Sequence, residues 1–156
     1  MIMKFYVPGV PVEKRIQARV MGSPSGRKFV QFYNPKARET ESVKYLLTRT
    51  IYSRLAPGRR YEMYGGPCEI RCLFNMPIPK SYPKSKRALI MAGKLQHVKK
   101  PDTSNLVKFI EDCLVGVVIV DDRQVINITA AKRYSDAPGT VIIIETLGGV
   151  HNANTH

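Results

Sequence analysis

Acidic residues are scarce in this sequence: twelve Asp and Glu face twenty-five Lys and Arg, which gives the 156 residues a net charge of +13 at pH 7. Such an excess opposes self-association at low salt and favours a polyanionic partner, either a phosphate backbone or an anionic membrane surface. Long apolar runs are also missing, since no segment approaches the ~20 apolar residues of a membrane span. The amino terminus lacks the layout of a signal peptide. We therefore expect a cytoplasmic protein that binds nucleic acid, with no membrane partner.

Cysteine is rare as well. The three cysteines, Cys68, Cys72 and Cys113, are an odd number without CxxC spacing, so neither a disulfide framework nor a structural zinc site is indicated. Cys68 and Cys72 are four residues apart in a segment with strand character, and we expect them to be core thiols on one face. The histidines form no ligand set, and His97, in a basic connection, is expected to contact DNA or solvent.

The length suits one domain with its own core. We expect this domain to span residues 1–147, followed by a disordered tail at residues 148–156. Alternating apolar residues and turn signals predict strands at 3–7, 68–75, 117–120, 125–132 and 140–146, and a hairpin made of 19–21 and 28–33. Helical spacing predicts two main helices, at 35–55 and from residue 104 to 114, and a short helix at 84–92 in the basic connection.

Residues 99–124 gather five of the twelve acidic residues, whereas residues 70–101 contain none and carry eight Lys or Arg. Asp102 stands at the start of the helix from 104, and Asp121 and Asp122 follow the predicted strand at 117–120. A helix and a reversing turn would bring these acids together. Hydrolysis of a phosphodiester requires a divalent cation, for which carboxylate oxygens are the preferred ligands. Lys108, on the polar side of that helix, would lie beside such a cation.

Each of these residues also has a purely structural interpretation. Asp102 is a favoured N-cap residue, a role that does not exclude metal binding. Asp121 and Asp122 are also typical of a polar hairpin connection. Lys108 and Asp112 have the spacing of an exposed i,i+4 ion pair. The conjunction of a helix-start Asp, a helical Lys, an Asp pair and a charge of +13 favours a metal site.

The segment IPKSYPKSKRALIMAGKLQHVKKPDTSNLVKFIEDCLVGVVIVDDRQV resembles the signature of the RusA family of Holliday junction resolvases. Its Lys-Pro-Asp opening, Asn-Leu-x-Lys helix and Asp-Asp-x-Gln ending recur there in that order. The resemblance implies an α+β fold with a mixed β-sheet, a homodimer that binds four-way DNA junctions, and symmetric cleavage of two strands with Mg²⁺ or Mn²⁺ and no organic cofactor. It also implies a bacterial or phage setting.

Carried over by position, the resemblance makes Asp102, Asp121 and Asp122 the metal ligands and Lys108 the lysine needed for cleavage. Ser104 stands where the family usually has a second aspartate, so metal affinity should fall unless Ser104, a water or Asp112 takes its place. The residues expected to contact or order the DNA are Lys84, Lys86, Arg87, Lys94, Lys99, Lys100, Asn105 and Lys132.

Two other functions stay open at this point. The Ser104 change predicts, as an alternative to a working nuclease, a catalytically impaired protein that only binds branched DNA. The other open function is a general nucleic-acid-binding module, in which the acidic residues have only a structural role. Tyr82, between Lys and Pro, is a further residue that we expect to be exposed near the branch point, whereas Phe74 is expected in the core.

Overall fold

The structure is a computed structural model that describes residues 1–148. The expectation of a disordered tail at 148–156 therefore falls, apart from Gly148, outside the described residues. In chain order the elements are β1 (Ile2–Pro8), β2 (Gln17–Gly22), β3 (Lys28–Tyr33), α1 (Ala37–Ser53), β4 (Cys68–Pro77), α2 (Lys84–Met91), α3 (Thr103–Leu114), the short 3₁₀ helix η1 (Asp122–Gln124), β5 (Val125–Ser135) and β6 (Gly139–Thr146).

The main sheet has four strands in the order β1-β6-β4-β5. β6 runs antiparallel to both β1 and β4, whereas β5 runs parallel to β4 and forms one edge. The chain reaches β5 from β4 through α2, α3 and η1, which is the kind of long crossover that a parallel pair requires. The expected mixed sheet and α+β fold are confirmed, with three α-helices in the described chain.

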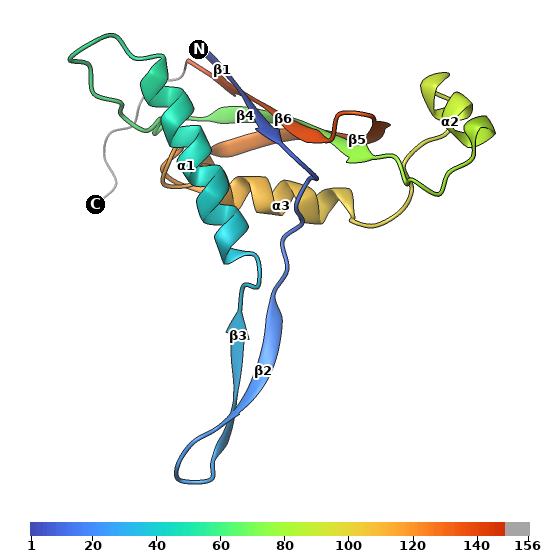
Figure 1. Cartoon of the computed structure of the whole chain (residues 1–156). Helices are drawn as coiled ribbons and strands as arrows, with labels where there is room; N and C mark the ends of the chain where they lie inside the picture. The colour runs from blue at the N-terminus through green and yellow to red at the C-terminus, as the bar shows by residue number, and fades with distance from the viewer. Residues whose placement is uncertain (149–156) are drawn as a thin grey trace.

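One face of this sheet is covered by α1 and α3 (Figure 1). β4 supplies the middle of the core because its even-numbered residues from Cys68 to Met76 all point to the covered face and are buried. α3 contributes a full apolar side and α1 a narrower one. Cys68, Cys72 and Cys113 are buried free thiols, as expected. Phe74, with no exposed surface, is a core residue.

The predicted strand at 117–120 is wrong. These residues form a turn after α3, in which Gly116 takes a positive φ of 79° and the N–H groups of Val118 and Ile119 both bond to the Leu114 carbonyl. The run is apolar because Val118 and Ile119 are fully buried. Four apolar residues fit a buried turn as well as a strand, so their pattern alone did not separate the two.

The hairpin predicted around residues 19–33 is confirmed, but β2 and β3 form a two-stranded sheet of their own that points away from the body (Figure 1). The expected short helix in the basic connection is α2, which lies at one end of the molecule. None of the helices within residues 1–148 has both the length and the apolar character that crossing a bilayer requires.

Candidate active site

Asp102 occupies the N-cap position of α3. Its carbonyl accepts hydrogen bonds from the backbone N–H groups of Asn105 and Leu106, at 3.1 Å each. Its side chain makes no capping hydrogen bond, and the residue is exposed. Asp102 is therefore the N-cap residue, as the structural interpretation expected, but its carboxylate does not cap the helix.

The side of α3 that faces away from the core carries Ser104, Lys108 and Glu111, a set called the polar stripe below. The spacing i, i+4, i+7 aligns these three residues along the helix. Ser104 and Lys108 are exposed and Glu111 is half-buried. The opposite side holds the apolar residues that the periodicity predicted to be buried, namely Leu106, Phe109, Ile110, Cys113 and Leu114.

Asp112 lies beside the polar stripe but is held by another element. The Lys14 ammonium lies 3.0 Å from its Oδ1 and 2.9 Å from its Oδ2. The expected i,i+4 ion pair between Lys108 and Asp112 is therefore wrong, and no ion pair of residues 1–148 involves Lys108. Asp112 is paired with Lys14, so its use in place of the aspartate that Ser104 replaces stays a prediction.

Asp121 and Asp122 have different surroundings although they are adjacent. Asp121 is the N-cap of η1: its Oδ1 accepts from the Arg123 N–H at 2.9 Å, and the Gln124 side chain accepts in return from the Asp121 N–H at 2.7 Å. The Arg123 guanidinium adds bonds of 2.8 and 3.0 Å to both carboxylate oxygens. These contacts hold the pKa of Asp121 well below its usual range.

Asp122 is the exposed member of the pair and forms no ion pair within the described chain. Its negative charge acts on Glu111, whose pKa is raised above its usual value. Burial is the largest cause, followed by the charges of Asp122 and Asp112, while Lys14 and Lys108 oppose the shift. Sequence reasoning assigned Glu111 no role, although its place three residues after Lys108 on the polar side was a signal.

The chemistry of the carboxylates suits a hard divalent cation, but their grouping is incomplete. Among residues 1–148, no three His, Cys, Asp or Glu side chains gather as a metal-binding group. Asp122 acts on Glu111 in the last turn of α3, whereas Asp102 precedes the first turn, and nine residues of helix span roughly 14 Å along the axis. The convergence of Asp102 and Asp122 on one shared cation remains a prediction.

The segment that leads into Asp102 is tied to the end of β5. The Lys132 ammonium donates to the carbonyls of Lys99 and Pro101, at 2.6 and 2.8 Å. These hydrogen bonds position the chain just before α3, and the expected contact of Lys132 with DNA stays a prediction. Asn105 likewise uses its carbonyl to accept from the Lys14 N–H at 2.9 Å.

An aromatic cluster holds the basic connection in place. The Tyr82 hydroxyl lies 3.2 Å from that of Tyr134, and the ammonium groups of Lys86 and Lys99 lie 4.6 and 5.3 Å from the centre of the Tyr82 ring. Tyr82 is half-buried rather than exposed. The bond to Tyr134 and then the one to Lys99 are the main causes that lower the pKa of Tyr82.

His97 belongs to the same cluster and is buried, contrary to expectation. Its ring packs 4.6 Å from that of Tyr134, and 8% of the residue is exposed. Burial, Lys132 and Lys99 lower the pKa of His97, which favours a neutral ring. Five lysines of the connection are exposed, namely Lys84, Lys86, Lys94, Lys99 and Lys100, while Arg87 is half-buried against the carbonyls of Pro79 and Tyr82.

Comparison with known proteins decides the family. A family model described as endodeoxyribonuclease RusA matches residues 8–145, which includes the acid pair, Lys108 and the hairpin. The chain belongs to the RusA family. A relative from Bacillus subtilis (strain 168), uncharacterized protein YqaN, is 30% identical over 145 residues, covering 91% of this chain and 94% of the relative. The family match begins well before Ile78, the first residue of the segment that carries the resemblance, so it also takes in the amino-terminal half of this RusA-family protein.

Proposed function

We propose that this RusA-family protein is a Holliday junction resolvase, a Mg²⁺-dependent endodeoxyribonuclease that cuts four-way DNA junctions symmetrically as a homodimer. Mn²⁺ is the expected substitute metal. The observation that carries the proposal is the match to an endodeoxyribonuclease family across residues 8–145. Two equivalent cuts in a two-fold branched substrate suit two sites related in the same way.

The site residues follow from this proposal. A bound divalent cation would activate water and offset charge on the phosphoryl oxygens. Asp102 and Asp122 would hold it, both being exposed carboxylates without an ion pair in residues 1–148. Asp121 would position Asp122 by capping η1. Lys108 would bring its ammonium to the scissile phosphate, where a fixed positive charge lowers the energy of the transition state.

The exposed lysines of the basic connection would bind the junction arms. Phosphate contacts of this kind give affinity without sequence preference, so selectivity would come from the geometry of the branch. Arg87 and the aromatic cluster would support this surface from beneath rather than touch DNA. Such an enzyme would act in DNA recombination and repair, in the cytoplasm of a bacterial or phage-infected cell.

The test is cleavage of an end-labelled four-way junction in Mg²⁺, in Mn²⁺ and in EDTA. We expect paired nicks in opposite strands with either metal, and a loss of about a hundredfold or more in Asp102→Asn and Asp122→Asn, because each removes a ligand charge. Asp136→Asn, in the exposed turn between β5 and β6, is the matched control and should cut like the wild type. Junction binding without nicks in either metal would refute the nuclease proposal.

A second candidate is a RusA-family protein that binds junctions without cutting them. Ser104 favours it, since a hydroxyl replaces the usual carboxylate, and so does the lack of a three-acid group in the described chain. Ser104→Asp distinguishes the two proposals: a gain of cleavage from none supports the second candidate, whereas a modest change in an already active protein supports the first.

A further inference from the structure

Residues 17–33, called the arm below, extend from the body into solvent (Figure 1). Every residue of β3 is exposed, and so is every residue of β2 except Met21, which is half-buried. A two-stranded hairpin without further support is only marginally stable in water. We therefore expect a binding partner to cover this arm in the functional complex.

The strand register gives the arm one apolar face. Ala18 pairs with Phe32 and Val20 with Val30, so the four side chains lie together on the same side. The larger side chains of this face are exposed, with 71% of Phe32, 65% of Val20 and 54% of Val30 open to solvent. This apolar face lacks any covering element within residues 1–148.

The charges of the arm indicate what covers it. Arg19, Arg27 and Lys28 are its charged residues, and residues 14–38 contain no Asp or Glu. None of the three forms an ion pair in the described chain. A phosphate backbone would be attracted by these cations, which no acidic residue of the arm offsets.

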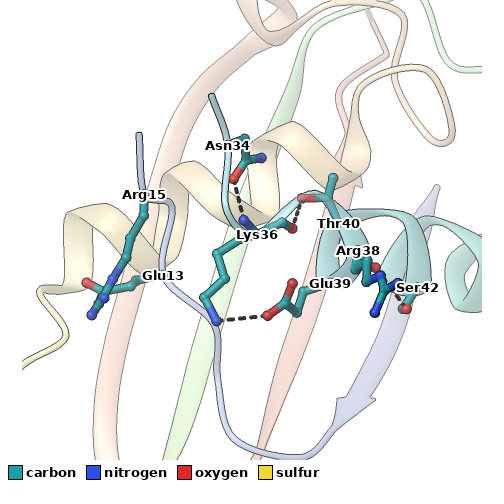
Figure 2. A network of polar contacts seen from close by, with 8 residues as sticks. All are labelled: Glu13, Arg15, Asn34, Lys36, Arg38, Glu39, Thr40 and Ser42. Carbon is teal, nitrogen blue, oxygen red and sulfur yellow. Dashed lines mark hydrogen bonds and ion pairs between the residues drawn. The ribbon is translucent and has the colours of Figure 1, made fainter. Parts of the chain in front are cut away.

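The root of the arm lies beside the candidate active site. On the entering side, the Lys14 N–H bonds to the Asn105 carbonyl of α3 at 2.9 Å, and its ammonium holds Asp112. On the leaving side, the Lys36 ammonium pairs with Glu39 at 2.8 Å at the start of α1 (Figure 2). The Lys14 contacts fix the entering leg of the arm next to the helix that carries the polar stripe, and the Lys36–Glu39 pair lies where the leaving leg enters α1.

We propose that the arm is a second DNA-binding element, in which Arg19, Arg27 and Lys28 bind phosphates and the apolar face packs against bases exposed at the branch. The inference rests on the nuclease function proposed above and adds to the basic connection a contact surface from a different part of the chain. Bases at a branch unstack more easily than bases within a duplex. Stacking of a base on an aromatic ring contributes on the order of tenfold in affinity.

The experiment uses the full chain in EDTA, which prevents cleavage, and measures fluorescence anisotropy with a labelled four-way junction and with a linear duplex. Val30→Ser with Phe32→Ser should weaken junction binding by about tenfold or more and change duplex binding little. Arg19→Gln with Lys28→Gln should weaken both and lower the salt slope by about two. Tyr45→Ser on α1, where the tyrosine is 70% exposed, and Arg60→Gln are the matched controls.

Wild-type junction affinity in both arm variants overturns the proposal. A shift from dimer to monomer in sedimentation, seen only in the arm variants, overturns it in favour of a second copy as the occupant. The charge variant keeps the apolar face, so it tests the arm even if the serine variant loosens the hairpin. If the wild-type protein binds junctions but never nicks them, the nuclease proposal is refuted and the proposal that the arm binds DNA stands. If the wild-type protein binds no DNA, both proposals are refuted.

Discussion

The polar stripe of α3 and the root of the arm are neighbouring regions, joined by the contacts of Lys14 with α3, yet their carboxylates differ. At the root, Asp112 is held by Lys14 and Glu39 by Lys36. At the candidate site, Asp102 and Asp122 form no ion pair with the described residues. In this basic protein a carboxylate is paired either by a lysine from another element, as Asp112 is, or by a cation close in sequence, as Glu39 is, whereas Asp102 and Asp122 stay open to a cation or a substrate.

The largest effect is expected from Lys108→Ala, which changes the rate of junction cleavage. This residue is the cation of the polar stripe that no carboxylate engages, so its charge is free for the scissile phosphate. We expect cleavage of a four-way junction to fall by about 10²- to 10³-fold with little change in junction affinity. Single-turnover rates and anisotropy measure the two quantities. Lys44→Ala on α1 is the control, and a rate equal to the wild type in Lys108→Ala would remove the residue from the mechanism.

The next largest effect, on the free energy of unfolding, is expected from removing the ion pair between Lys14 and Asp112 at the root of the arm. Lys14→Ala leaves Asp112 without its cation and loosens the leg of the arm on α3. A partly exposed ion pair of this type contributes up to ~1 kcal/mol to the free energy of unfolding, equivalent to about 2–4 °C in Tm for a chain of this size. Asp112→Asn should behave alike, and the double variant should lose no more than either single one. Additive losses would show that the two residues act independently.

Glu111 gives a pH test of the site's negative charge. The pKa of Glu111 is raised in the folded protein, so ionised Glu111 opposes folding. The stability that protonated Glu111 contributes is fully present below the pKa that it has in the unfolded chain. This stability is lost as pH rises through the pKa that it has in the folded protein. Glu111→Gln should therefore raise Tm at pH 7 and have no such effect near pH 4. Thermal melts across this pH range measure it. A Tm difference that is the same at every pH would mean that neither burial nor the charges of Asp122 and Asp112 raise the pKa of this carboxyl.

The smallest effect is expected from Arg123→Ala. This change removes the guanidinium from Asp121 but keeps the backbone cap of η1. The Arg123 side chain is 87% exposed and that of Asp121 is 38% exposed, so solvent screens the pair. We expect no measurable change in Tm and at most a small loss of cleavage through the position of Asp122. A loss as large as that of Asp122→Asn would mean that the Asp121 pair orders the site itself.

Much of this molecule was predictable from local pattern. The 3.6-residue spacing of apolar side chains identified α1 and α3 and separated the core side of α3 from the polar stripe. Alternation identified β4 and β6, and the turn residues at 22–27 identified the hairpin. The motif around Asp102, Lys108 and the Asp pair identified the family that the comparison confirmed. Each of these signals depends on residues close together in the chain, which is why the sequence alone contained them.

Other features depended on neighbours distant in sequence. The apolar run at 117–120 became a buried turn because Tyr64 pairs with it and α3 ends beneath it. His97 was buried by Tyr134, and Lys132 was drawn to the backbone before Asp102. Composition by itself determined a basic protein suited to a polyanion. Only the tertiary structure decided the long-range ion pairs, Lys14 with Asp112 and Arg71 with Glu145, because their members must meet in space and local spacing does not report such meetings.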